Sequence, residues 1–298
     1  MSAQRVAVVT GAGNGIGAEV ATALAADGFA VVVADLGADL AGTTRDEAAA
    51  TRTVERIRAA GGTATAAFAD VGDFEQARGI IDTAVGEFGR LDVLINAAGI
   101  VRDKMIFNLG EDEWDAVIRV HLKGAYNTAH HASRWWRANR GGDYRLINIV
   151  SGAGMFGAPG QPNYAAAKMG VLGLTLSCAN ALKRYGVTSV AVWPSATTRM
   201  TSTVPADRAG QLGLRVDDEM DPANVAPGLV YLARPDRAWL NGQTVGFRGY
   251  RLVLYSGFEV SREIVGTAPW TADSAATAIE QTFRPAIERR GLFDAQAS

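Results

Sequence analysis

Cysteine is almost absent from this chain of 298 residues, in which Cys178 stands alone. A single cysteine excludes an intrachain disulfide and a cysteine-based metal cluster, and it is typical of a reducing compartment. The chain also lacks a run of 18 apolar residues, and Met1–Arg5 leads into an apolar segment without the charged start of a signal peptide. We therefore expect a cytoplasmic protein that has no metal site and does not bind a membrane.

An excess of charge of either sign is missing as well. Lys and Arg together number 29, Asp and Glu number 31, and the formal net charge is -2. This balance gives no electrostatic reason to expect a nucleic acid or an anionic membrane as a partner. The apolar residues make up 48% of the chain, which is enough for a large core. The length allows one large domain or two small ones.

Short apolar segments alternate with amphipathic helical patterns along most of the chain. A helical repeat contains Ile16, Val20 and Leu24, for example, and the tail contains a further helical pattern at about Ala272–Arg284, which we expect Pro285 to end. Because strands and helices alternate, we predict an α/β fold with a doubly wound parallel sheet. The predicted strands are 5–10, 30–35, 63–69, 91–96, 145–150, 187–193 and 251–255.

A glycine-rich loop follows the first predicted strand and leads directly into a helix. Its spacing is T-G-x-x-x-G-x-G, and it does not match the general G-x-G-x-x-G pattern. Glycines let the backbone approach a pyrophosphate, and the helix N-terminus favours an anion. The alternative is a helix entry that merely needs flexibility. We predict a dinucleotide site that includes Gly11, Gly13, Asn14, Gly15, Ile16 and Gly17.

Three further segments end predicted strands at the same edge of the sheet. Asp35 follows the second strand, where its carboxylate would bind the ribose hydroxyls of NAD and repel the 2′-phosphate of NADP, unless it is a turn aspartate. Asp70 and Val71 follow the third strand, and Asp70 would hold the adenine amino group or cap the next helix. Small residues after the fourth strand would let the backbone approach the cofactor: Asn96, Ala97, Ala98 and Gly99.

Ser151, Tyr164 and Lys168 follow the fifth predicted strand and have the residue types of an acid–base site. Tyr164 and Lys168 are four residues apart, so a helix would place phenol and ammonium on one face. A nearby cation lowers the pKa of a tyrosine, which suits proton exchange with a hydroxyl or carbonyl. Taken alone, the Tyr-x-x-x-Lys spacing is more typical of an ordinary surface helix, and its position after the predicted dinucleotide site, with Ser151 upstream, favours the catalytic interpretation.

These motifs, in this order, resemble the short-chain dehydrogenase/reductase family over about residues 4–255. The resemblance implies a Rossmann-like sheet of about seven strands and hydride transfer between a nicotinamide and a carbinol carbon. It also implies that Tyr164 is the acid–base residue, that Lys168 lowers its pKa and holds the nicotinamide ribose, and that Ser151 binds the reacting oxygen. Pro194 and Thr198 would contact the carboxamide, although Ser195 replaces the family's usual glycine and the loop is one residue shorter.

His121 stands where the family usually has an asparagine that supports a proton relay. A neutral histidine can donate and accept hydrogen bonds, so His121 would keep the relay, or else it only packs. The segments 35–39, 99–104, 119–124 and 195–201 are similar to the dehydrogenase domain of multifunctional enzyme 2 and its bacterial relatives. That similarity implies (3R)-hydroxyacyl-CoA substrates. The candidates for coenzyme A contacts are Arg102, Lys104, Arg208 and Arg215, although each of them, taken singly, is more typical of a solvated surface residue.

We therefore predict an NAD-dependent dehydrogenase that acts on a secondary alcohol, and the leading substrate class is a 3-hydroxyacyl-CoA. The competing hypotheses are a hydroxysteroid dehydrogenase, an NADP-dependent ketoacyl reductase and a silent dinucleotide-sensing module. Residues 1–255 are predicted to form the dinucleotide-binding domain, and residues 256–298 an extension that packs on it or on a partner subunit. The resemblance also implies a homodimer or a homotetramer.

Overall fold

A computed structural model describes residues 4–39, 41–197 and 218–290 of the chain. The contacts between residues divide the chain into two compact units. The first unit contains Met1–Thr203 and Arg215–Tyr255, and the second contains Val204–Leu214 and Ser256–Ser298.

The first unit contains a single sheet of eight strands in the order β3-β2-β1-β4-β5-β6-β7-β8. The strands from β3 to β7 are parallel to one another, and β8 runs antiparallel to β7. This order confirms the predicted Rossmann-like, doubly wound fold. The bounds are β1 (Val6–Thr10), β2 (Ala30–Ala34), β3 (Thr63–Ala67), β4 (Val93–Asn96), β5 (Tyr144–Ile149), β6 (Val187–Ser195), β7 (Thr244–Arg248) and β8 (Arg251–Tyr255).

The sheet has one strand more than the seven that the sequence predicted, and the additional strand is β7. Its sequence, TVGFR, is interrupted by Gly246 and ends in Arg248, so it has no continuous apolar pattern. It forms because its backbone pairs on both sides, with β6 through Ala191↔Thr244 and with β8 through Thr244↔Tyr255. A local pattern does not contain this long-range pairing.

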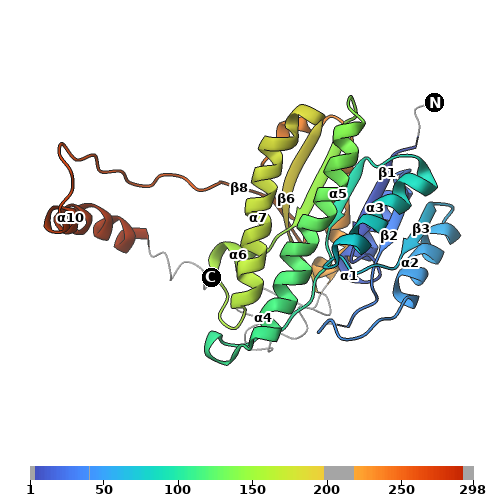
Figure 1. Cartoon of the computed structure of the whole chain (residues 1–298), viewed down its shortest axis with the longest axis horizontal. Coiled ribbons are helices and arrows are strands. Elements are labelled where there is room, and N and C mark those ends of the chain that lie inside the picture. Colours follow the sequence, from blue (N-terminus) through green and yellow to red (C-terminus); the bar gives the residue numbers. More distant parts are fainter. Residues whose placement is uncertain (1–3, 40, 198–217, 291–298) are drawn as a thin grey trace. The chain divides into compact units, whose positions relative to one another are not determined.

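Helices cover both faces of the sheet, with α1 and α2 on one face and α3, α5 and α7 on the other (Figure 1). The first turn of α5 continues from α4 through a π-helical segment, η2 (Arg119–Lys123). Single 3₁₀ turns lie at Ile106–Asn108, Lys183–Tyr185, Asp218–Met220, Pro222–Asn224 and Ala238–Leu240. The bounds of the α-helices are α1 (Gly15–Ala26), α2 (Ala48–Ala59), α3 (Phe74–Phe88), α4 (Glu111–Ile118), α5 (Gly124–Ala138), α6 (Gly152–Phe156), α7 (Pro162–Leu182), α9 (Ala226–Ala233) and α10 (Ala272–Arg290).

The central strands are apolar on both faces because each face packs against helices. In β1, Val9 belongs to the core cluster that also contains Leu24 of α1, whereas Val8 belongs to the cluster that contains Ile80 of α3. Both valines are 0% exposed. Continuous apolar strands of this kind are typical of a parallel sheet that is covered on both sides. They also hold the carboxyl ends of the strands in fixed positions.

The carboxyl ends of β1 and β4 lie where the order of the sheet reverses direction. From β1 the chain continues outward to β2 and β3, and it then crosses to β4 on the other side of β1. In open α/β sheets, this switch point is where ligands bind. The predicted site segments follow β1, β2, β3, β4 and β5, so they all lie at this edge.

Helix α7 and the turn after it, residues 162–185, are long and apolar enough by mean hydropathy to cross a membrane. In the structure, however, α7 packs on β5 and β6. It contains the buried polar side chains of Lys168 and Thr175. A core helix beneath a polar site accounts for the same composition.

In the second unit, the described part of the chain contains α10 (Ala272–Arg290). The sequence predicted that Pro285 would end this helix, and that prediction was wrong because Pro285 lies inside it. An interior proline removes one backbone hydrogen bond and crowds the carbonyl of the preceding turn, but its φ angle is helical, so the helix continues past Pro285 at a cost in stability.

Candidate active site

The glycine-rich loop forms a tight turn between β1 and α1. Gly11 has a φ of +66°, and a side chain there would place its Cβ 2.7 Å from Cα of Ala98. A Cβ on Gly17 would lie 2.2 Å from the carbonyl oxygen of Gly11. Only glycine allows the backbone of the loop, of the first turn of α1 and of the segment after β4 to lie this close.

Thr10 joins the glycine loop to the segment that follows β4. Its Oγ1 accepts hydrogen bonds from the backbone N–H groups of Ala97, at 3.1 Å, and Ala98, at 3.2 Å. Thr10 is 1% exposed. Thr10 was not among the predicted site residues, although its place at the end of a strand, directly before the first glycine, was a signal.

Asp35 lies beside the glycine loop, as its position after β2 predicted. Its carboxylate accepts a hydrogen bond from the N–H of Gly13, at 2.7 Å, and another from the N–H of Gly37, also at 2.7 Å. A carboxylate has about four acceptor positions, so two remain for ligand hydroxyls. The half-buried side chain thus combines a structural role in the loop with acceptor capacity at the site.

Asp70 pairs with Arg119, which was not among the predicted site residues. One carboxylate oxygen accepts a hydrogen bond from the N–H of Gly72, at 2.8 Å, and the other binds the Arg119 guanidinium, at 2.7 Å. The helix cap that was the alternative role for Asp70 belongs instead to Asp73, which accepts from the N–H of Gln76. Asp70 and Val71 therefore form a turn just before α3, at the end of β3.

Ser151, Tyr164 and Lys168 come together at the carboxyl end of β5. Ser151 caps α6 and forms a hydrogen bond with Tyr164. Lys168 is 5% exposed, and its Nζ lies 5.6 Å from the centre of the Tyr164 ring. Its ammonium donates a hydrogen bond of 2.8 Å to the carbonyl oxygen of Ile149. The four-residue spacing on α7 thus places phenol and ammonium at one site.

Burial dominates the acid–base properties of this site. It raises the pKa of Tyr164 to about 12, a rise that the hydrogen bond from Ser151 opposes and the negative charge of Asp103 reinforces. Burial also lowers the pKa of Lys168 to about 7. The sequence predicted a lowered tyrosine pKa, and the direction in this site is the opposite. The reason is that both groups have lost water, which disfavours the charged form of each.

His121 lies in the π-helical segment η2 and reaches the same site. It is 3% exposed, and burial together with the charge of Lys168 lowers its pKa to about 3. Its Nε2 lies 2.7 Å from the carbonyl oxygen and 3.0 Å from the backbone nitrogen of Ile100. Within the described part of the chain, its buried Nδ1 has no hydrogen-bond partner. His121 is therefore a neutral imidazole with one ring nitrogen available.

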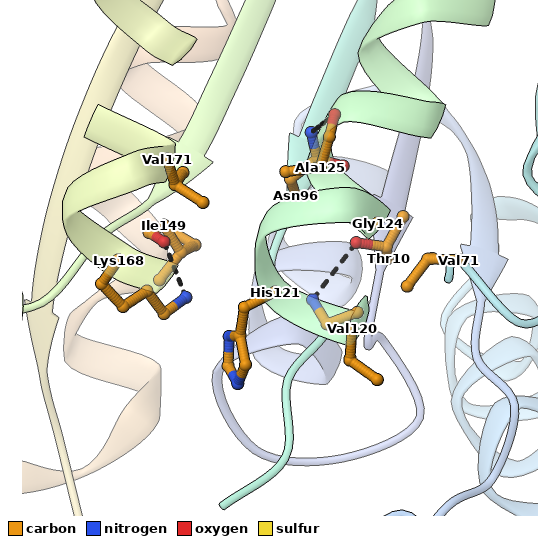
Figure 2. A pocket seen from close by; sticks show the side chains of 11 residues that line it. Thr10, Val71, Asn96, Val120, His121, Gly124, Ala125, Ile149, Lys168 and Val171 are labelled. Atoms are coloured by element: carbon orange, nitrogen blue, oxygen red, sulfur yellow. Dashed lines mark hydrogen bonds between the residues drawn. The ribbon is translucent and has the colours of Figure 1, made fainter. Parts of the chain in front are cut away.

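A small cavity lies beside Lys168 and His121 (Figure 2). Its volume is about 10 Å³, which is close to the space that one water molecule requires. Figure 2 shows Lys168 reaching toward Ile149 from α7, with the His121 ring beside the same space. The lining residues are Thr10, Val71, Asn96, Ala98, Val120, His121, Gly124, Ala125, Ile149, Lys168 and Val171.

Asn96 lines this cavity, but a buried network already uses its side chain. Its amide donates to Oδ1 of Asn148, at 2.9 Å, and its amide oxygen accepts from the hydroxyl of Thr128, at 2.7 Å. Asn96 thus joins β4 to β5 and α5, and any contact it makes with a cofactor would come from its backbone. Pro194 pairs with Phe247 at the end of β6, whereas Thr198 lies outside the described residues.

The residues at this edge of the sheet fit a dinucleotide. The glycine loop leads into the start of α1, where Gly15 is exposed and the first backbone N–H groups can meet an anion. Asp35 and Asp70, whose carboxylates keep further acceptor positions, lie at the ends of β2 and β3. The residues that would hold the cofactor at its other end are Tyr164 and Lys168. This donor and acceptor set matches a diphosphate, a ribose and an adenine better than a metal ion.

Comparison with known proteins supports the same assignment. Residues 5–209 match the family model of the short chain dehydrogenases. The hydroxyacyl-CoA dehydrogenase ChsB1 of Mycobacterium tuberculosis is 41% identical over 263 residues, which cover 85% of this chain and 80% of that protein. The peroxisomal hydratase-dehydrogenase-epimerase of Saccharomyces cerevisiae is 42% identical over 229 residues, 76% of this chain but only 24% of that longer protein.

A similar structure is that of a short chain dehydrogenase from Mycobacterium avium. The two chains superpose with a TM-score of 0.83 and are 44% identical. The match covers 94% of each chain.

Proposed function

Because the chain belongs to the short-chain dehydrogenase family, and is therefore an oxidoreductase that acts on CH–OH groups of small molecules, we propose that it converts 3-hydroxyacyl-CoA thioesters to 3-ketoacyl-CoA thioesters with NAD. The observation that carries the reaction is the meeting of Ser151, Tyr164 and Lys168 beside the glycine loop. The substrate class is supported by the relatives whose names include hydroxyacyl-CoA dehydrogenase and hydratase-dehydrogenase-epimerase.

The side chains can divide the proton chemistry among them. When bound, the nicotinamide would supply the acceptor for the hydride of the carbinol carbon. Ser151 orients the reacting oxygen, and Tyr164 accepts the hydroxyl proton in oxidation or donates it in reduction. The protonated form of Lys168, with its Nζ 5.6 Å from the centre of the phenol ring, stabilises the phenolate of Tyr164. His121 and the small cavity, which has room for about one water molecule, lie beside Lys168 and would relay the proton from there.

The position of Asp35 supports NAD rather than NADP. Its carboxylate lies at the end of β2 and binds the N–H of Gly13 at 2.7 Å. The negative charge would repel a 2′-phosphate and accept hydrogen bonds from a free ribose diol. The NADP-dependent ketoacyl reductase is disfavoured for the same reason.

A hydroxysteroid or another ring-bearing alcohol is the second candidate, favoured by an aromatic cluster beside Ser151. The Trp193 ring packs on Gly152, where a Cβ would lie 2.3 Å from the indole. Phe156 and Tyr255 contact Trp193, with ring centres 5.6 Å and 5.0 Å away. Phe156 is 50% exposed, so this cluster offers an exposed apolar surface. Among the coenzyme A candidates, Lys104 pairs with Glu113 and Arg102 donates to Ala41, while Arg208 and Arg215 lie outside the described residues.

A turnover panel tests the proposed function. The purified chain would be assayed with NAD or NADP against (3R)- and (3S)-hydroxyacyl-CoAs of several lengths, hydroxysteroids and simple secondary alcohols. We expect the largest kcat/KM for a 3-hydroxyacyl-CoA with NAD. A larger value for a steroid would establish the second candidate. Cofactor binding without turnover of any substrate would favour the silent dinucleotide-sensing module.

We also propose that the chain assembles as a homodimer or homotetramer. The edge strand β8 leaves Leu252 82% and Leu254 67% exposed. Apolar side chains on an open edge strand are stabilised when another copy covers them. Sedimentation velocity would measure the assembly, and a monomer at micromolar concentration would refute it.

A further inference from the structure

We propose that Arg119 is a positioning residue for the cofactor, and that it holds the Asp70 carboxylate to receive the 6-amino group of adenine. The inference rests on the proposed function in one respect, the binding of a nicotinamide adenine dinucleotide. It does not depend on the choice between NAD and NADP, because both contain adenine.

The ion pair between Arg119 and Asp70 joins two distant parts of the chain. Nη1 of Arg119 lies 2.7 Å from Oδ2 of Asp70. The Asp70 side chain is 9% exposed and that of Arg119 is 46% exposed. The guanidinium therefore neutralises a carboxylate that has little access to water, while part of the guanidinium side chain itself stays exposed.

Hydrogen bonds to two different helices hold the turn that contains Asp70. On one side, its N–H donates to the side chain of Gln76 in α3, at 3.0 Å. On the other side, Asn127 of α5 donates to the carbonyl oxygen of Val71, at 2.8 Å. A Cβ at Gly72 would lie 2.6 Å from Nη1 of Arg119 and 3.0 Å from its Cγ, so a larger residue would displace the guanidinium from this position. Arg119 thus lies directly against the turn.

The free acceptor positions of Asp70 determine which ring it selects. Each carboxylate oxygen already accepts one hydrogen bond, from Gly72 or from Arg119. A carboxylate has about four acceptor positions and no donor. It can accept from the 6-amino group of adenine, whereas the 6-carbonyl of hypoxanthine would face it with a second acceptor. Arg119 makes this selection sharp by fixing the orientation of the carboxylate.

The π-helical segment explains how one helix serves both ends of the site. Arg119 and His121 are two residues apart in η2 (Arg119–Lys123). Arg119 reaches the end of β3, whereas His121 reaches Ile100 and the Tyr164 ring. Single π-helical turns are frequent at functional sites. Here the turn places one side chain at the predicted adenine pocket and the other at the proton-transfer site.

Dissociation constants for three probes test the inference. The probes are NADH, its analogue with hypoxanthine in place of adenine, and reduced nicotinamide mononucleotide, which has no adenine. Titration by fluorescence transfer to the nicotinamide would be made on the full chain, on R119M and R119K, and on R78M as a control. Arg78 forms an exposed ion pair with Glu75 elsewhere on α3.

We expect the parent chain to bind NADH about 10- to 100-fold more tightly than the hypoxanthine analogue. R119M should lose most of this preference, R119K should keep part of it, and R78M should keep all of it. The mononucleotide should bind equally to all four proteins. Equal losses for NADH and the hypoxanthine analogue in both Arg119 variants would overturn the inference, because a general structural role would weaken both. Absence of dinucleotide binding by the parent chain would overturn the proposed function as well.

Discussion

The imidazole ring of His121 meets the phenol ring of Tyr164 edge to face, with 5.0 Å between the ring centres and 89° between the ring planes. Lys168 approaches the same phenol ring, with its Nζ 5.6 Å from the ring centre. Tyr164 therefore contacts a neutral imidazole and lies close to the ammonium. The pKa of the phenol therefore depends on its burial among these neighbours and on the charges close to it.

Replacing Tyr164 by Phe should stop the chemistry and leave cofactor binding intact. The phenol supplies the proton exchange, and such acid–base groups contribute about 10²- to 10⁴-fold to a rate. Single-turnover kinetics would measure hydride transfer, and NADH titration would measure binding. Tyr126→Phe, at a tyrosine that is 47% exposed, is the control. Comparable turnover by Y164F would remove Tyr164 from its role.

Replacing Asp35 by Ala should weaken NADH far more than NADPH. The carboxylate would bind the ribose diol of NAD, and its loss would also remove the repulsion of a 2′-phosphate. Dissociation constants for both cofactors would be compared with those of Asp39→Ala, at a nearby aspartate whose carboxylate binds Thr43. Equal losses for the two cofactors would mean that Asp35 acts only by holding the N–H of Gly13.

Replacing Asp103 by Asn should shift the pH dependence of oxidation to lower pH. The negative charge of Asp103 raises the pKa of Tyr164, so a neutral amide should lower that pKa. Oxidation requires the phenolate, and its rate should therefore rise at a lower pH in the variant. The measurement is log kcat/KM against pH for both proteins. A profile that stays in place, or moves to higher pH, would contradict the electrostatic coupling.

Replacing His121 by Ala should slow proton transfer and spare cofactor binding. The variant removes Nδ1 from the cavity beside Lys168, and the expected loss is below the roughly 10²-fold effect of a direct acid–base group. The solvent isotope effect on kcat would be measured alongside the NADH dissociation constant. Because His121 is 3% exposed, H121N is needed as a smaller but polar replacement. An unchanged rate in H121A would leave His121 as a packing residue.

Replacing Thr10 by Val should lower the free energy of unfolding. The hydroxyl accepts from the N–H groups of Ala97 and Ala98, and each buried donor left without an acceptor costs about 1–3 kcal/mol. Thr10→Ser keeps the oxygen and should lose much less. Urea unfolding would give both values. A Val variant as stable as the parent would mean that water replaces the hydroxyl.

The sequence by itself determined those features that depend on neighbours along the chain. Alternating strand and helix patterns predicted the doubly wound sheet, which the strand order confirms. The glycine loop between a strand and a helix, and the four-residue spacing of Tyr164 and Lys168, predicted which side chains would share an edge of the sheet. Strand β7 was missed because Gly246 breaks its local pattern while its neighbouring strands supply its hydrogen bonds.

Only the tertiary structure decided the contacts between distant residues and the electrostatics of the site. Arg119 meets Asp70 across 49 positions, and Thr10 meets Ala97 across 87. Such pairs depend on how helices pack on the sheet, which periodicity does not contain. The raised pKa of Tyr164 has the same origin. A lysine four residues away predicts a lower value, but the folded chain removes water from both groups, and this loss of solvation disfavours the charged form of each.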